Sequence, residues 1–365
     1  MSRRRYLWNF LVGLALAAHA PLAFAQEKQW ERAFDVIYET QWQQSGILDG
    51  VKRWPARQDK VLTFTINVGA SSSNADRARS ALARVLAVLD MTTRELVAGD
   101  ETAQIQFDIR RFAPEELLQH ACYAQSTSSG GQLSRVKLVL NEPSTYWCVL
   151  HELMHAMGLP GHPQGDTVLS YFEGNRLSLK PIDEFLLRAW YTDGIKPGMS
   201  PLVAVRIINR MWIEQSLAPQ EQARAALVER QWYERTIAGL EAFANGAGEP
   251  PLILFRSGKL NATGMKMGQM NVQSILGFSY FNGLSVAQDR IKGAGYMLKA
   301  AQNGNRNAVA NLLRVLAIAD LPVEASATLC KWFATAAVEE TGLTKPAQDQ
   351  ALASAACKPG TDSNR

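Results

Sequence analysis

The spacing of hydrophobic residues predicts an α/β arrangement in the first half of the chain. Apolar residues recur at helical intervals over residues 27–44 and 75–97, which indicates two amphipathic helices. A Ser/Gly-rich loop is expected at residues 126–131, and a further helix at about 144–157. Three stretches alternate apolar with polar residues or are rich in β-branched residues, which is typical of strands. The predicted strands are residues 61–68, 105–109 and 136–140.

The pattern becomes purely helical after Tyr191. Residues 200–245 are expected to be helical throughout, and a Gly/Pro-containing stretch at 246–251 separates them from the rest. A chain of 365 residues is long for one hydrophobic core, so two domains are predicted. We place them at residues 26–198 and 199–365.

The N-terminus has the three parts of a secretory signal peptide. Three arginines, Arg3 to Arg5, precede an apolar run from Tyr6 to about Ala20, and small residues lead to expected cleavage near Ala25/Gln26. The run is too short and too interrupted for a membrane span. The mature protein is therefore expected to be periplasmic or secreted, with no stable membrane anchor after signal cleavage.

Charge and cysteine content narrow the class of protein. The formal net charge of the whole chain is +4, and three of its cations lie in the leader, so the remainder is almost neutral and no nucleic-acid partner is expected.

The four cysteines are expected to form disulfides, because disulfides persist in exported proteins. Four cysteines allow three pairings, among which proximity favours Cys122 with Cys148 and Cys330 with Cys357.

The predicted helix at 144–157 carries the most informative motif, His-Glu-Leu-Met-His at residues 151–155. Residues four apart share a helix face, so His151 and His155 can present ring nitrogens to one cation. Glu152 points about 100° round the helix and can reach water at the metal without binding it, which suits a general base. Zinc prefers such ligands and activates water for attack on a carbonyl.

A catalytic zinc usually takes three protein ligands, so a third is needed. Gly158 permits a turn that brings the chain back, and the window resembles the metzincin peptidases, whose pattern is HExxHxxGxxH. The eleventh position of that pattern is Gly161 here, and the histidine comes one residue later. The resemblance implies one zinc per chain with His162 as third ligand. Asp166 and, in a gluzincin-like arrangement, Glu173 are the alternatives for that ligand.

A second segment extends the resemblance. Metzincins have a tight turn beneath the metal, often S-x-M-x-Y, where this chain has Thr167-Val-Leu-Ser-Tyr171. Leu169 stands in the methionine position, and Tyr171 matches the tyrosine that stabilises the oxyanion in some branches. The resemblance implies a zincin-like α+β catalytic domain, with Tyr171 as a transition-state hydrogen-bond donor. The competing interpretation of Tyr171 is a half-buried aromatic residue.

Two broader resemblances concern organisation. Residues 45–210 are similar to a family of exported proteobacterial proteins known only as a domain of unknown function, distantly related to metallopeptidases. Residues 271–312 resemble a Sel1-like repeat, a relative of the tetratricopeptide class, within an all-α C-terminal domain. An ordinary helical bundle is the alternative for this region.

Two further residues near the motif have competing interpretations. Cys148 lies on the predicted motif helix and is either a thiolate ligand or the disulfide partner of Cys122, and export favours the disulfide. His120 is interpreted as a surface histidine, or as one that contacts a metal ligand without binding the metal itself.

The leading functional hypothesis is a zinc-dependent peptidase of the cell envelope, with a peptide or protein substrate and a possible protein partner bound by the helical repeat region. One alternative is a catalytically inactive metal-binding or interaction scaffold in the periplasm. Another is an amidase acting on cell-wall peptides.

Overall fold

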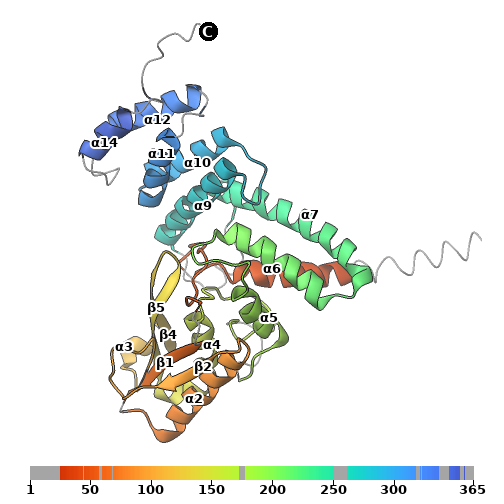
Figure 1. Ribbon diagram of the computed structural model, residues 1–365, viewed down its shortest axis with the longest axis vertical. Helices are drawn as coiled ribbons and strands as arrows, with labels where there is room; N and C mark the ends of the chain where they lie inside the picture. The colour runs from red at the N-terminus through yellow and green to blue at the C-terminus, as the bar shows by residue number, and fades with distance from the viewer. Residues whose placement is uncertain are drawn as a thin grey trace, which may run out of the picture.

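The computed structural model (Figure 1) describes most of the chain downstream of the predicted leader. The predicted signal segment, residues 1–25, lies outside the described residues except at its last position. Every helix within the described ranges is too short or too polar to cross a membrane. The described residues are 25–43, 45–56, 60–67, 69–171, 177–249, 261–317, 321, 323–336, 345–353 and 357.

A five-stranded mixed sheet, in the order β2-β1-β3-β5-β4, forms the framework of the first half of the chain. The four strands β1, β2, β3 and β5 are parallel, whereas the edge strand β4 runs antiparallel to β5. The predicted α/β class is thereby confirmed. The strands are β1 (Val61–Ile66), β2 (Thr92–Glu95), β3 (Ile105–Arg110), β4 (Cys122–Ser129) and β5 (Gln132–Asn141).

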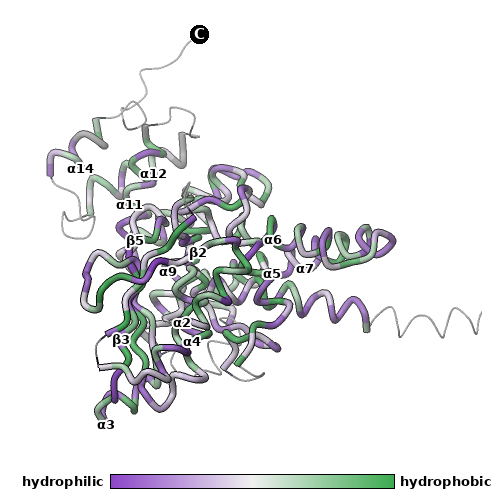
Figure 2. The backbone as a smooth tube through the Cα atoms, turned by 60° about the horizontal axis from the view of Figure 1, so that its bottom comes forward, coloured by the Kyte–Doolittle hydropathy of each residue, from purple (hydrophilic) through white to green (hydrophobic). Residues whose placement is uncertain are grey.

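Two helices pack against each other and against this sheet: α2 (Ser72–Ala87) and α4 (Thr145–Ala156). The buried side chains of α2 follow helical spacing and join those of β1, β3 and β5 in one core. Figure 2 shows hydrophobic residues concentrated along the strands near β3. The apolar face predicted for α2 therefore packs on the sheet.

The predicted helix over residues 75–97 was wrong at its C-terminal end. Helix α2 ends at Ala87, the chain turns with Asp90 at a φ of 52°, and residues Thr92–Glu95 form β2. This strand pairs in parallel with β1. Leu89 and Leu96 continue a helical spacing by coincidence, and β-branched Thr92 and Thr93 take the extended conformation instead.

The predicted loop at residues 126–131 was also wrong. Residues up to Ser129 belong to β4, and only Gly130 and Gly131, with φ of 55° and 81°, make the turn into β5. Two successive left-handed residues are what a tight hairpin requires. The serines are exposed because β4 lies at the edge of the sheet.

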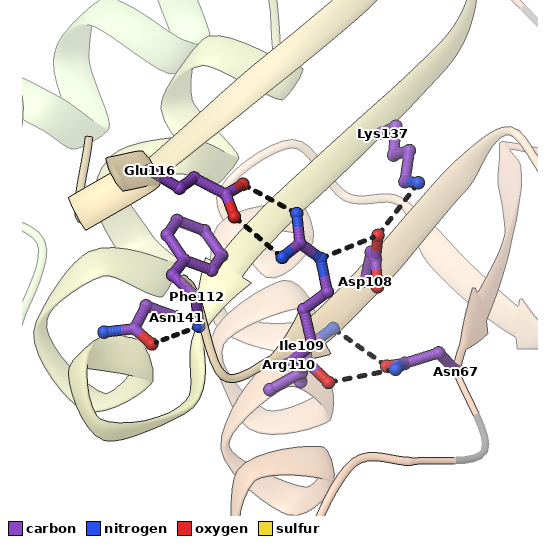
Figure 3. Close-up of polar contacts among 8 residues, drawn as sticks. All are labelled: Asn67, Asp108, Ile109, Arg110, Phe112, Glu116, Lys137 and Asn141. Atoms are coloured by element: carbon purple, nitrogen blue, oxygen red, sulfur yellow. Dashed lines mark hydrogen bonds and ion pairs between the residues drawn. The ribbon is translucent and has the colours of Figure 1, made fainter. Parts of the chain in front are cut away.

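Polar contacts fix the end of β3 and the short helix α3 (Pro114–Leu117) that follows it (Figure 3). The Asn67 side chain donates to the Ile109 carbonyl at 2.9 Å and accepts from the Ile109 N–H at 2.8 Å, which mimics a missing strand neighbour. Arg110 makes two hydrogen bonds to the Glu116 carboxylate. These contacts hold the connection that leads into β4.

The second half of the described chain is helical, as the pattern predicts, and forms the upper part of the molecule in Figure 1. Residues 200–245 are not one continuous helix, because the chain is extended at Leu217 and Ala218 before Pro219 begins a new helix. The helices are α6 (Pro201–Ser216), α7 (Pro219–Ala244), α9 (Ala262–Asn282), α10 (Arg290–Gln302), α11 (Arg306–Ala317), α12 (Val323–Thr335) and α14 (Lys345–Leu352).

Helices α9 and α10 approach closely through two glycines. A Cβ at Gly277 would lie 2.8 Å from the Met297 nitrogen, and one at Gly293 would lie 2.5 Å from the Phe281 nitrogen. The predicted repeat at residues 271–312 covers the end of α9, all of α10 and the start of α11. Its assignment to the Sel1 class stays a prediction, as does the domain boundary at 198/199.

The first described helix, residues 25–39, belongs to two hydrophobic cores. It ends five residues earlier than the sequence predicts. Val36 and Ile37 pack into the core around the sheet, whereas Trp30 and Phe34 pack with α6, α7 and α9. This helix therefore connects the metal-motif region with the helical region.

Candidate metal centre

The motif helix α4 follows β5 directly, through the 3-10 turn η1 (Glu142–Ser144). Most of its side chains are buried, including His151 and Glu152, and His155 is half-buried. A helix held on several sides by the core gives its polar residues fixed positions. The sequence thus builds a rigid support for the motif.

Two hydrogen bonds from histidine rings to backbone carbonyls orient the two histidines of α4. Nδ1 of His151 lies 2.8 Å from the Val168 carbonyl oxygen, and Nδ1 of His155 lies 2.7 Å from the Leu159 carbonyl oxygen. A carbonyl only accepts, so each Nδ1 carries the proton and each Nε2 keeps its lone pair. Both rings are therefore in the tautomer that binds a metal through Nε2.

Gly158 ends α4 as predicted. Its φ is 93°, and a Cβ there would lie 1.9 Å from the Lys52 carbonyl oxygen. Only glycine satisfies both the left-handed conformation and this close approach. The chain then returns toward α4.

Gly161 shows why the histidine is displaced by one residue from the metzincin pattern. Its N–H donates to the Thr40 carbonyl at 2.9 Å, and a Cβ there would lie 2.1 Å from the Glu39 carbonyl oxygen. No side chain fits at this position without moving the backbone. The next residue, His162, provides the imidazole, and the N–H of Gln164 donates to the Glu39 carboxylate at 2.7 Å to fix the loop beyond it.

The three histidines His151, His155 and His162 converge on one point. Their Nε2 atoms are 3.0 to 3.2 Å apart in each pair. The corners of a triangle with sides near 3.1 Å lie about 1.8 Å from its centre, so a cation slightly above that plane is about 2.0 to 2.1 Å from all three nitrogens, as zinc requires. The three-histidine group could therefore hold a metal ion.

The electrostatics of the group favour a cation as well. Burial lowers the pKa of His155 to about 4, so this ring is neutral near neutral pH. The three Nε2 atoms are only about 3 Å from one another, so their lone pairs repel unless a positive charge lies between them. A metal ion at the shared point would supply that charge.

Tyr171 lies against the histidine group. Its ring stacks on His162 with centroids 4.1 Å apart and on His151 with centroids 5.2 Å apart. The residue is 40% exposed and lines the adjacent cleft. Leu169, which stands in the methionine position, is fully buried in the core.

The other ligand candidates lie elsewhere or outside the described residues. The Asp166 side chain is 68% exposed and pairs with Lys180 at 3.3 Å, and Glu173 lies outside the described residues. Cys148 forms a disulfide with Cys122, so its sulfur is not a thiolate ligand. His120 lies in the cleft with its ring 5.5 Å from that of Tyr123.

A cleft of about 370 Å³ opens over the histidine group. Glu152, His155 and His162 line it together with four residues of the edge strand β4: Cys122, Tyr123, Ala124 and Ser126. The disulfide between Cys122 and Cys148 joins this strand to α4. The second disulfide links Cys330 and Cys357, so both pairings favoured by proximity are present.

Sequence reasoning missed the residues that hold the three histidines in place. Val168 accepts from His151 through its carbonyl, and Asp183, at the start of α5 (Pro181–Trp190), accepts from the Val168 N–H. Glu39 and Thr40 hold the His162 loop. Backbone contacts leave no pattern in a sequence, although a buried aspartate at the third position of a helix is consistent with a capping box.

A scan against protein-family models found no family that matches the chain, and a search of curated proteins found no match.

Proposed function

We propose that this protein is a zinc-dependent peptidase of the zincin-like, metzincin-related type, with His151, His155 and His162 as metal ligands. The observation that carries the proposal is the convergence of three Nε2 atoms, 3.0 to 3.2 Å apart, beside a cleft that Glu152 also lines. Histidines with three nitrogens on one point and an open side are the ligand set of a catalytic rather than a closed structural zinc.

Zinc bound here would act as a Lewis acid that polarises a substrate carbonyl and lowers the pKa of water toward about 7. Glu152 is the group that accepts the proton of the attacking water and passes it to the leaving amine. Its helix position, one residue after His151, brings its carboxylate to the cleft without making it a ligand. The Tyr171 hydroxyl donates to the oxyanion that develops on the substrate.

The edge strand supports a peptide as the substrate class. Among the described strands β4 pairs with β5 alone, and its residues Cys122, Tyr123, Ala124 and Ser126 line the same cleft as Glu152. An extended peptide can add to such an edge through backbone hydrogen bonds, which hold it without a requirement for particular side chains. A scissile bond laid along β4 would then face the histidine group.

Export to the cell envelope is part of the proposal. Two disulfides, Cys122–Cys148 and Cys330–Cys357, are typical of oxidising compartments and agree with the secretory leader inferred from residues 1–25. The helices α9 to α11, whose spacing resembles a Sel1-like repeat, would bind a protein partner or present substrate.

The decisive experiment measures zinc content and cleavage together. Purified protein is expected to contain about one zinc per chain and to cleave an unfolded protein substrate. Glu152→Gln is expected to keep the zinc and to lose at least about a hundredfold in cleavage rate, since a general base contributes roughly that much.

Glu184→Gln serves as the matched control, because Glu184 is an exposed glutamate on α5 that pairs with Arg188. It is expected to keep both zinc and activity. Zinc binding without cleavage of any protein substrate by the wild type would favour the metal-binding scaffold instead. Release of peptides from a cell-wall digest, with protein substrates untouched, would favour the amidase.

A further inference from the structure

A buried hydrogen-bonded chain leads from the Asp183 carboxylate to the first histidine of the site. The Thr167 hydroxyl donates to Oδ1 of Asp183 and accepts from the Leu169 N–H at 3.2 Å. The Leu169 N–H shares its peptide group with the Val168 carbonyl, which accepts from Nδ1 of His151 at 2.8 Å. Carboxylate, hydroxyl, peptide group and imidazole are thus connected in series.

The direction of every bond in this chain is fixed by chemistry. An ionised carboxylate only accepts, so the Thr167 proton points to Asp183 and a hydroxyl lone pair faces the Leu169 N–H. The peptide group then presents its carbonyl to His151, whose Nδ1 must carry the proton. Each bond polarises the next in the same sense, which strengthens the series.

Burial and several hydrogen-bond donors fix the position of the Asp183 carboxylate. Asp183 is fully buried, and its Oδ2 also accepts from the N–H groups of Val168 at 3.1 Å and Lys180 at 2.8 Å. Thr167, Val168 and Leu169 are fully buried too. Burial raises the pKa of Asp183, and the hydroxyl and N–H donors oppose that rise by stabilising the charged form.

We propose that Asp183 and Thr167 are positioning residues that hold and polarise the Val168–Leu169 peptide group, and that they thereby fix the orientation of the His151 ring and raise the zinc affinity of its Nε2. The inference rests on the zinc site of the proposed function, and it does not require that the protein cleave peptides. A negative charge at the far end of the series increases electron density at the imidazole, which makes Nε2 a better ligand. Removal of such outer partners typically costs about 10- to 100-fold in metal affinity.

The test compares Thr167→Val with Thr167→Ser. Valine has nearly the same shape as threonine but lacks the hydroxyl, whereas serine keeps the hydroxyl and lacks the methyl group. Zinc affinity is measured by titration of Zn²⁺ against a competing chelator. Thr167→Val is expected to bind zinc about 10- to 100-fold more weakly than the wild type, and Thr167→Ser within about threefold of it. Asp183→Asn, which places an NH₂ group opposite an N–H or hydroxyl donor, is expected to weaken zinc binding by at least as much.

The matched control is Thr145→Val. Thr145 is also fully buried, and its hydroxyl donates to the Asn141 carbonyl at 3.3 Å, at the start of α4 and outside the series. This variant is expected to lose stability without loss of zinc affinity. If Thr167→Val binds zinc as tightly as Thr145→Val does, the proposal is wrong.

A second measurement works on metal-free protein. The ¹⁵N chemical shifts of the His151 ring report which nitrogen carries the proton, and the wild type and Thr167→Ser are expected to show the Nδ1–H tautomer. Because the Val168 carbonyl still only accepts, Thr167→Val is expected to keep this tautomer but to show an Nδ1 shift displaced toward that of a weaker N–H···O hydrogen bond. An Nδ1 shift in Thr167→Val identical to that of the wild type would overturn the proposal, even for a protein with no peptidase activity.

Discussion

The N–H of Gly161 donates to the carbonyl of Thr40 at 2.9 Å, across 121 positions of sequence. This contact joins the loop that carries His162 to the end of the first described helix. Because the approach leaves no room for a Cβ, it also explains a glycine where a metzincin has its third histidine.

Gly161→Ala is the first test of this contact. The added Cβ would lie 2.1 Å from the Glu39 carbonyl oxygen, so the loop must move. We expect a loss of about 1 to 3 kcal/mol in the free energy of unfolding and weaker zinc binding, measured by denaturant titration and by competition with a chelator. Gly239→Ala is the control, because nothing lies within 4 Å of its added Cβ in α7; that variant is expected to be neutral or slightly stabilising. Equal effects of the two substitutions would contradict the tight contact.

The identity of the third ligand gives a second prediction. His162→Ala is expected to lower the zinc content of purified protein well below one per chain, because two protein ligands remain. Asp166→Ala is expected to keep the zinc, since that carboxylate is exposed and pairs with Lys180. Zinc measured by elemental analysis after dialysis distinguishes them, and the reverse result would transfer the ligand role to Asp166.

Acid should destabilise the metal-free protein through His155. The folded-state pKa of about 4 for His155 lies below the ordinary value of 6.5. The contribution of the neutral His155 ring to the free energy of unfolding is therefore complete above about pH 6.5 and is lost as the pH falls toward 4. The loss amounts to about 2 to 3 kcal/mol in the free energy of unfolding. His155→Gln cannot titrate at this position and is expected to show a shallower decline over that range. Chemical denaturation at several pH values measures both, and parallel curves would exclude His155 as the cause.

The two disulfides provide a matched pair, because their sequence separations are 26 and 27 residues. Loop-entropy arguments assign each a similar contribution, about 3 kcal/mol. Replacement of Cys122 and Cys148 by serine is expected to lower both stability and cleavage rate, since that bridge ties β4 to α4 beside the cleft. Replacement of Cys330 and Cys357 is expected to lower stability and leave the zinc affinity unchanged. If only the variant that lacks Cys330 and Cys357 loses zinc affinity, these separate roles of the two disulfides are wrong.

Local patterns were sufficient to predict the elements that carry the motif. The apolar positions of α2 and α4 and the alternation in β1, β3 and β5 reflect burial against one core, which leaves a periodic pattern in the sequence. Gly158 was also predictable, because a left-handed residue at a helix end favours glycine.

Elements stabilised by distant partners were not predictable in the same way. Strand β2 has four residues and depends on pairing with β1, and β4 is polar because its exposed serines lie at a sheet edge. The contacts that orient the ligands involve backbone groups of Val168 and Thr40, which any residue type provides. The convergence of His162 with the other two histidines follows from those contacts, so the sequence could only suggest it by resemblance.

The helix at residues 25–39 has a consequence for cooperativity. Trp30 and Phe34 are buried against α6, α7 and α9, while Val36 and Ile37 are buried around the sheet, and Thr40 at its end holds the His162 loop. Melting of this helix would expose apolar surface in both cores at once and release the loop that carries His162. The region that carries the three histidines and the helices α6, α7 and α9 are therefore thermodynamically coupled, and a ligand that stabilises one of these two regions also stabilises the other.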